Sequence, residues 1–278
     1  MRGLVTRQKK APLPGAFFIW VLLSVFGLGL CLSSGQVAAS EPCPADRIDE
    51  TVKVSYVNDG DTVRLADGRR VRLIGLDTPE IGRDGQPDEP FAQGARRKLE
   101  QLVRENDQRL ALRFDAESQD RHGRLLAHAF LPDGRSVARL MLEDGLAAQV
   151  FIPPNLWNKD CLLPVEERAR RRGIGIWSLP EFARGLDAQA MPASVRGMAL
   201  VRGRVESIGR SRQAGWINLE GGVSLRIDDR DLPLFAGQDF DRLKGRSVEA
   251  RGWINPQGGQ RKGWRMSLRH PDALRTLD

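Results

Sequence analysis

The sequence contains 278 residues, which is enough for one large domain or two of ordinary size. Hydrophobic residues make up 41% of the chain and charged residues 28%, a composition that excludes wholesale disorder. The formal charge of +7 is unevenly distributed: residues 50–180 contain 21 basic and 21 acidic residues, whereas residues 195–278 contain 16 basic and 10 acidic residues. The positive charge of the C-terminal third indicates contact with nucleic acid or another acidic surface.

The N-terminal segment has the pattern of an export signal. Four basic residues precede an apolar run over 16–32, and small residues that end at Ala39 follow the run. The pattern predicts a signal peptide over residues 1–39 and a secreted or periplasmic mature chain. The alternative is an uncleaved anchor in the cytoplasmic membrane with the rest of the protein outside, because the run is only slightly shorter than a membrane-spanning helix.

Three cysteines are present, and Cys31 would leave with the signal peptide. Cys43 and Cys161 remain, and an even number of cysteines in an exported chain predicts a disulfide between them. The alternative is a pair of unrelated buried thiols. We expect Cys161 to lie just before the last helix of its domain.

Residues 40–180 predict a domain of the α+β class. The strands are expected at 51–57, 62–66, 69–76, 109–115 and 125–131, and the helices at 91–105, 136–143 and 164–172. Asp67-Gly68 predicts a hairpin turn, and Ser136 is a suitable cap for the second helix. Strands that precede and follow a helix in this way indicate a five-stranded β-barrel of the oligonucleotide-binding (OB) type with helices on its side.

Residues 180–195 lack clear periodicity and contain two prolines, so we expect a linker over 181–195. Residues 196–278 then predict a second, smaller all-β domain of OB-like type. Its strands are expected at 199–208, 216–219, 223–227, 247–253 and 264–268. No sequence repeat relates the two domains.

Three short segments carry the residue types needed for chemistry. They are Asp59-Gly60-Asp61-Thr62, the segment from Arg72 to Glu80 (RLIGLDTPE), and the segment 120–127 (DRHGRLLA). Each segment alone is typical of a turn or a strand end. Their combination supplies hard oxygen ligands, a carboxylate base and guanidinium groups, which are the parts needed for phosphodiester hydrolysis.

The oxygen ligands come from two of these segments. Asp61, Asp77 and Glu80 provide three carboxylates, and Thr78 provides a backbone carbonyl. Such ligands suit calcium, or less readily magnesium. Arg72 and Arg124 add two guanidinium groups, whose planar fork matches phosphate oxygens.

Three motifs follow one another along the chain: DGDTV, then R-L-(x)3-DTPE, and, after a helix, D-(x)2-GR-L-x-A. In their order and spacing they resemble the motifs of the staphylococcal nuclease (thermonuclease) family. The resemblance covers residues 51–177 and ends at Trp177. It implies that Asp61, Asp77 and Thr78 hold a calcium ion.

The same resemblance implies roles for three further residues. Glu80 would act as general base on the attacking water, and Arg72 and Arg124 would bind the phosphate and stabilise the charged transition state. The expected substrates are DNA and RNA, cleaved at the P–O5′ bond to leave 3′-phosphates. We expect the enzyme to be a monomer.

The nucleotide pocket departs from the family pattern. Family members place tyrosines around the nucleotide, whereas this chain has only Tyr56. His122 stands where a tyrosine would precede the Gly-Arg pair, so Arg121, His122 and Phe151 are the candidates for substrate contacts. His122 and Phe151 would retain stacking on the base but not a hydroxyl contact to phosphate. The alternative for His122 is an exposed turn residue without a role.

Two other classes of function compete with the nuclease hypothesis. Some relatives, especially those fused to Tudor domains, keep the barrel as a non-catalytic module that binds nucleic acid or a partner. Those relatives lose the acidic and arginine residues that this chain retains. A different metal phosphoesterase would normally show a cluster of histidines and aspartates.

One geometric conflict lies within the second motif. In a straight strand Arg72 and Asp77 point to opposite faces. For both side chains to meet one phosphate the chain must bend, and Gly75 is the residue that would tolerate such a bend.

The second domain lacks an acidic cluster of the metal-binding kind, so we expect no catalysis from it. Its positive charge and its residues Trp216, Trp253 and Trp264 suggest that it holds nucleic acid, because barrels of this type pair a basic groove with stacking aromatic rings. The alternative is that the tryptophans belong to its core and that the domain packs against a partner.

Overall fold

The structure, a computed structural model, describes residues 43–257 and 263–277. The expected export segment over 1–39 therefore lies outside the described residues. Within the part of the chain that is described, no helix is long and apolar enough to cross a membrane.

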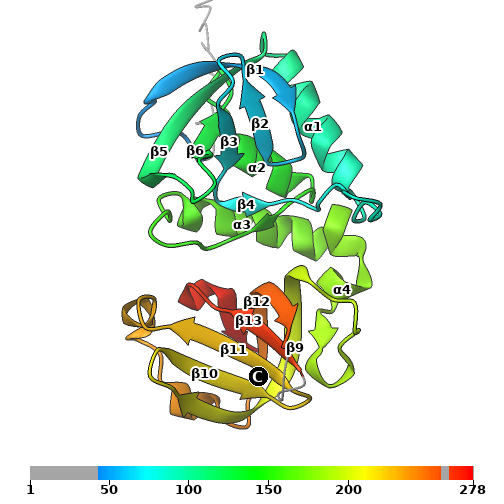
Figure 1. Cartoon of the computed structure of the whole chain (residues 1–278), viewed down its shortest axis with the longest axis vertical. Helices are drawn as coiled ribbons and strands as arrows, with labels where there is room; N and C mark the ends of the chain where they lie inside the picture. The colour runs from blue at the N-terminus through cyan, green and yellow to red at the C-terminus, as the bar shows by residue number, and fades with distance from the viewer. Residues whose placement is uncertain (1–42, 258–262, 278) are drawn as a thin grey trace, which may run out of the picture. The chain divides into compact units, whose positions relative to one another are not determined.

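The first domain is a closed five-stranded barrel in which the strands follow the order β1-β2-β3-β6-β5 (Figure 1). The strands are β1 (Glu50–Val57), β2 (Thr62–Leu65), β3 (Arg70–Leu73), β5 (Arg109–Gln119) and β6 (Leu125–Phe130). β3 and β6 run parallel, and the other neighbours are antiparallel. Alternate residues such as Val52 and Val54 are buried in the barrel, which explains the period-two apolar pattern of the sequence.

Three helices accompany this barrel: α1 (Ala92–Arg104), α2 (Val137–Glu143) and α3 (Lys159–Arg172). The apolar stripe of α1 is buried, as the helical spacing predicted. Ser136 caps α2, and its hydroxyl accepts a hydrogen bond of 3.3 Å from the backbone N–H of Arg139.

The expected start of the last helix was wrong. α3 begins at Lys159 rather than at Pro164, so the proline lies inside the helix. The N–H of Leu162 donates to the carbonyl of Asn158, and Leu162 is fully buried, which holds the turn that precedes the proline. A proline usually marks a helix start, and here buried contacts override that signal.

The predicted disulfide is confirmed between Cys43 and Cys161, which are 118 residues apart in the sequence. Cys161 lies in the first turn of α3 and not before the helix. The bond therefore joins the segment that precedes β1 directly to α3.

The predicted bend at Gly75 is also present. β3 ends at Leu73, and Gly75 has a φ of +86°, a conformation that favours glycine. The following strand β4 (Leu76–Asp77) leaves the barrel and pairs with β7 (Ala148–Gln149). The bend turns Asp77 toward the side of β3 that carries Arg72.

The second domain closes in the order β9-β10-β11-β13-β12, with β12 pairing back to β9. Its strands are β9 (Gly197–Arg210), β10 (Ala214–Leu219), β11 (Val223–Asp228), β12 (Ser247–Pro256) and β13 (Trp264–Ser267). β11 and β13 are parallel, so this barrel repeats the strand order of the first barrel. Both predicted barrels are thus confirmed, although no sequence repeat relates them.

The segment 181–195 is more structured than the expected linker. It contains most of the short helix α4 (Pro180–Ala183) and the 3₁₀ turn Ala188–Ala190. Between them lies β8 (Leu186–Asp187), which pairs with β9. Elements of two to four residues are too short to leave a periodic pattern in the sequence.

Buried ion pairs join the second barrel to α3. Arg170 donates two hydrogen bonds of 2.8 and 2.6 Å to Glu249 on β12. Two residues further along β12, Arg251 donates a hydrogen bond of 2.6 Å to Glu166. Because all four side chains are largely withdrawn from solvent, these pairs fix β12 against α3.

Candidate active site

The turn between β1 and β2 places Asp61 at the base of the site. Asp61 is only 2% exposed to solvent. Its carboxylate accepts hydrogen bonds from the backbone N–H and from the hydroxyl of Thr78, at 3.0 and 3.1 Å. Gly60 allows this close approach, because a Cβ there would lie 2.7 Å from Cγ2 of Thr78 and 2.6 Å from Cβ of Ala95. The structure therefore brings together the first two of the three motifs.

Arg72 joins these two motifs electrostatically. Its Nη2 lies 2.5 Å from Oδ1 of Asp77, and its Nη1 forms an ion pair with Asp61. The guanidinium thus stands between two of the three residues that the resemblance assigns to the metal. Among the described residues, no group of three acidic, histidine or cysteine side chains is arranged to hold a metal ion.

The acidic side chains nevertheless suit a hard cation. Burial raises the pKa of Asp59, which is 5% exposed. Partial burial in the cleft, together with the charges of Asp59 and Asp77, raises the pKa of Glu80. Carboxylates that resist ionisation in this way lack sufficient positive charge nearby, and an ion with oxygen ligands would supply it. Asp61, Asp77 and the carbonyl of Thr78 are the residues that could hold it.

Glu80 is positioned through its backbone. Its N–H donates a hydrogen bond of 2.9 Å to the carboxylate of Glu89, and its carbonyl accepts one of 3.0 Å from the N–H of Glu89. The two bonds close the loop 81–88. Glu80 is exposed as a residue although the cleft partly desolvates its carboxyl, and its side chain forms no hydrogen bond with a described residue, so it is free to bind water.

Arg124 reaches the same site from the position just before β6. The parallel pairing of β3 with β6 sets Arg72 beside Leu126, and Arg124 points to the same side two residues earlier. Asp120 orients Arg124. Its carboxylate accepts a hydrogen bond of 2.9 Å from the backbone N–H of Arg124 and one of 2.7 Å from its Nε. Two guanidinium groups therefore face one place beside the acidic cluster.

These residues line a cleft of about 1380 Å³. Arg121 and His122 lie on its rim, and both are exposed, with Nε of Arg121 donating to Nε2 of His122 at 3.1 Å. Their position agrees with a substrate contact and equally with an exposed turn. Tyr56 does not line the cleft; its hydroxyl accepts from Arg96.

The expected stacking role of Phe151 is not supported. Phe151 is 4% exposed and packs in the core of the second barrel, with its ring 5.6 Å from the ring of His270. The ring therefore cannot meet a base without leaving that core. Its neighbour Ile152 lines the cleft instead.

Some residues of the site were not predicted. Asp59 and Asp120 belong to the quoted motifs, but only their partners Asp61 and Arg124 were singled out. Their signal lay in the motif spacing, since a carboxylate two or four residues before a functional residue can bond to its backbone. The cleft is also lined by residues of the second barrel, for which the first-domain motifs gave no signal. These are Asp228, Arg230, Trp253, Ser267 and Arg269.

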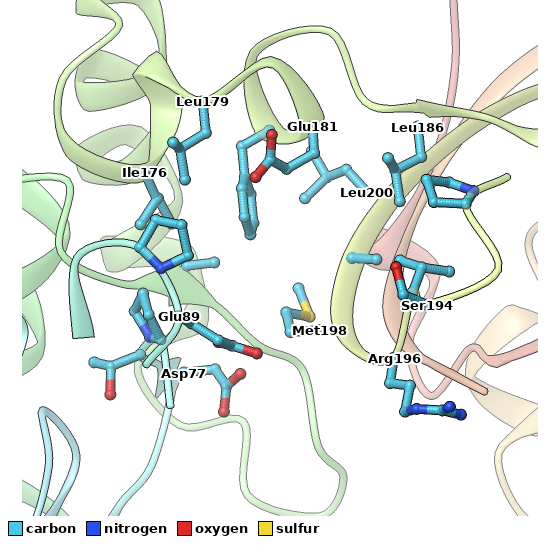
Figure 2. A pocket seen from close by; sticks show the side chains of 18 residues that line it. Asp77, Glu89, Ile176, Leu179, Glu181, Leu186, Ser194, Arg196, Met198 and Leu200 are labelled. Atoms are coloured by element: carbon cyan, nitrogen blue, oxygen red, sulfur yellow. The ribbon is translucent and has the colours of Figure 1, made fainter. Parts of the chain in front are cut away.

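A second, smaller pocket lies behind the segment that carries Asp77. Figure 2 shows Asp77 and Glu89 on one side of it, Ser194 and Arg196 on the other, and Met198 between them. Its volume is about 330 Å³, and its walls include apolar side chains of the segment 176–200. Asp77 and Thr78, two of the expected metal ligands, thus share this pocket with residues of the segment between the two barrels.

The family model described as "Staphylococcal nuclease homologue" matches residues 70–179. The Thermonuclease of Staphylococcus intermedius is 35% identical over 131 residues, which are 46% of this chain and 76% of that protein. Two Bacillus subtilis proteins, the SPbeta prophage-derived endonuclease YokF and the endonuclease YncB, are 33% and 34% identical. The matches cover 46% and 43% of this chain, and 40% and 58% of those proteins.

The region that the family model matches contains β3, the parallel strand β6, and the site residues Arg72, Asp77, Glu80 and Arg124, whereas Asp61 precedes it. Its barrel, its helices and its motif order agree with the identity to the thermonuclease. The chain therefore belongs to the staphylococcal nuclease family.

Proposed function

We propose that the protein is an exported, calcium-dependent nuclease that hydrolyses phosphodiester bonds of DNA and RNA at the P–O5′ bond and leaves 3′-phosphates. Its family membership makes it a hydrolytic nuclease. The observation that carries the proposal is the convergence of Asp61, Asp77 and Glu80 with Arg72 and Arg124 in one cleft. A non-catalytic module would have no need of this set.

In the proposed reaction Glu80 takes a proton from a water molecule, whose oxygen attacks the phosphorus. The bond from phosphorus to O5′ breaks, O5′ takes up a proton, and the phosphate stays on the 3′ oxygen. Arg124, already oriented by Asp120, holds a non-bridging oxygen and stabilises the charge that develops there. General-base and charge-stabilising groups of this kind each contribute about 10²–10⁴-fold to the rate.

A calcium ion held by Asp61, Asp77 and the Thr78 carbonyl would supply positive charge that polarises the phosphate. Arg72 then has to exchange at least one carboxylate for a phosphate oxygen. Its short connection to both acids keeps the guanidinium at the place where the phosphate is expected. Asp61 and Asp77 thus position Arg72 to bind the phosphate before the substrate arrives.

Two observations support export. The N-terminal sequence has a basic, apolar and small-residue pattern, and the disulfide Cys43–Cys161 suits an oxidising compartment. The proposal therefore places the enzyme outside the cytoplasm, either released or held by an uncleaved membrane anchor. A monomer suffices, since one chain supplies all the residues of the cleft.

The bond that is cleaved can be tested from the product ends. A 5′-labelled DNA or RNA oligonucleotide is digested with calcium, and the products are treated with a 3′-phosphatase. The proposal expects every 5′-labelled product to lose a phosphate and to migrate more slowly in a denaturing gel. Products with 3′-hydroxyl ends, which the phosphatase leaves unchanged, would overturn the assignment of the bond.

A further inference from the structure

The second barrel presents one side of β12 to the first domain. Glu249 and Arg251 are on that side, where they pair with Arg170 and Glu166 of α3. Side chains two residues apart on a strand share a face, so Trp253 follows them on the same side. It lines the cleft that contains Arg72 and Arg124. The ion pairs that attach the barrel thus also set a tryptophan beside the site.

Trp253 begins a row of side chains across four neighbouring strands, which we call the aromatic row: Trp253, Ser267, Arg226 and Trp216. Ile254 pairs with Met266, which sets Trp253 next to Ser267. Ser267 pairs with Arg226, and Arg226 pairs with Trp216. The row therefore leads from the cleft over the outer face of β13, β11 and β10.

The alternation of buried residues shows that the aromatic row points outward. Ile254, Met266, Leu225 and Ile217 are each at most 1% exposed, whereas the residues of the row are half-buried. Trp264 behaves differently, since it packs against the core of the barrel. Of the three tryptophans singled out in the sequence, one is structural and two lie on a surface.

On the described part of this face the acidic side chains are paired with arginines, whereas one arginine is unpaired. Arg226 lies over the ring of Trp216, 5.9 Å from its centroid, and forms an ion pair with Asp228. Asp231 is neutralised by Arg269 at 2.5 Å. Arg230 is exposed in the cleft and has no hydrogen bond or ion pair with any of the described residues. Both acids of this face are thus matched, and Arg230 remains available.

We propose that a single strand of nucleic acid runs from the catalytic cleft along the aromatic row, with bases stacked on Trp253 and Trp216 and a phosphate bound by Arg230. The proposal rests on the nuclease function proposed above. Flat rings on an outer face bind unpaired bases, whose faces a duplex keeps covered. The strands that carry Trp216 and Arg226 are the second and third of the barrel, the face that OB-type barrels use for oligonucleotides.

The test compares a dinucleotide with a single strand of about 20 nucleotides, longer than the ~4–16 nucleotides that an OB-type barrel covers. The dinucleotide offers only the scissile phosphodiester to the cleft, whereas the strand also extends over Trp253 and along the row to Trp216. For Trp216→Ala and Trp253→Ala, kcat/KM for the strand relative to the dinucleotide should fall at least about fivefold each, since a stacked base contributes on the order of 5- to 150-fold. Trp216→Phe and Trp253→Phe should keep most of the ratio because they retain a ring.

Charge is tested with a matched pair of arginines. Arg230→Ala should make the logarithm of the affinity less dependent on the logarithm of salt concentration, by a slope of about 1. Arg242 is the control: its side chain is 86% exposed, it pairs with Asp239, and it does not line the cleft. Arg242→Ala should keep the salt slope of the parent enzyme.

A binding readout separates this proposal from the nuclease function. In the Glu80→Gln background, the oligonucleotide should quench tryptophan fluorescence, and Trp216→Ala with Trp253→Ala should remove most of that quenching. If the parent enzyme cleaves no substrate but quenching follows this pattern, the proposed nuclease function is wrong and the proposed role of the aromatic row is supported. If both substrates are cleaved and neither the ratio nor the quenching changes, or if a duplex binds as tightly and depends on the same residues, the aromatic row is overturned.

Discussion

Arg72 and Asp77 form an ion pair in which Nη2 lies 2.5 Å from Oδ1, although the two residues would point to opposite faces of a straight strand. The bend at Gly75 makes the contact feasible, and the same guanidinium also pairs with Asp61. A proposed phosphate ligand therefore neutralises two proposed calcium ligands. A cation and Arg72 compete for the same carboxylates.

This competition predicts opposite effects on binding and on rate. Arg72→Ala should tighten calcium binding, because it removes a positive charge from Asp61 and Asp77, while kcat falls by about 10²–10⁴-fold through the lost phosphate contact. Arg124→Ala is the control, since Arg124 pairs with Asp120 instead. It should lower kcat similarly and leave calcium affinity close to that of the parent, as measured by isothermal titration calorimetry. Weaker calcium binding by Arg72→Ala would refute the competition.

Glu80→Gln separates catalysis from folding. The substitution should lower kcat by about 10²–10⁴-fold, because glutamine cannot accept the proton. The raised pKa of Glu80 means that the folded protein disfavours its ionised form, owing to burial and to the charges of Asp59 and Asp77. Removing the charge should therefore leave the thermal unfolding temperature of the metal-free protein unchanged or higher. A variant that retains near-normal kcat would exclude Glu80 as the base.

Glu249 predicts acid sensitivity at the junction of the barrels. Burial alone would raise the pKa of this carboxyl, but hydrogen bonds from Arg170 and Arg202 and the charges of Arg170 and Arg275 lower it to about 2. Its stabilising contribution, on the order of 3 kcal/mol, is present above the ordinary glutamate pKa and is lost as the pH falls toward 2. Urea unfolding of the parent and of Glu249→Gln should give free energies that differ at pH 7 and converge at acid pH. Curves that stay parallel would contradict this role.

The disulfide predicts a large stability difference between oxidised and reduced protein. A bond that closes 118 residues restricts the unfolded chain, which in the chain-entropy model stabilises the fold by about 4–5 kcal/mol. The double variant Cys43→Ser with Cys161→Ser should unfold at lower denaturant concentration, and reductant should destabilise the parent but not the variant. Equal midpoints for parent and variant would show that the bond contributes nothing.

Much of this fold could be predicted because its strands alternate regularly. The five strands of each barrel were expected within a few residues of their observed bounds, and the bend at Gly75 followed from the opposite directions of Arg72 and Asp77. The start of α3 could not be predicted, since the turn before Pro164 is held by tertiary contacts. The elements in 181–195 were missed because each is too short to show a period.

The residues of the site likewise divide into those that the sequence predicted and those that it did not. Residues of two different motifs, such as Asp61 and Thr78, were assigned to one metal site and are hydrogen bonded to each other. Phe151 was misjudged because its burial depends on core residues of the second barrel, from Ala188 to Leu274, which are distant from it in the sequence. The directions of the tryptophans did have a signal: Trp264 shares its face with Met266, whereas Trp216 and Trp253 precede the buried Ile217 and Ile254.

The metal requirement tests the central claim most directly. Purified full-length protein is incubated with single-stranded DNA and with RNA in calcium, in magnesium, or in excess chelator, and initial rates of acid-soluble product formation are measured. The account predicts cleavage of both substrates in calcium, slower cleavage in magnesium, and none above background in chelator, with Arg124→Ala reduced by about 10²–10⁴-fold in calcium. Full activity in chelator, or no cleavage of either nucleic acid in calcium, would contradict it.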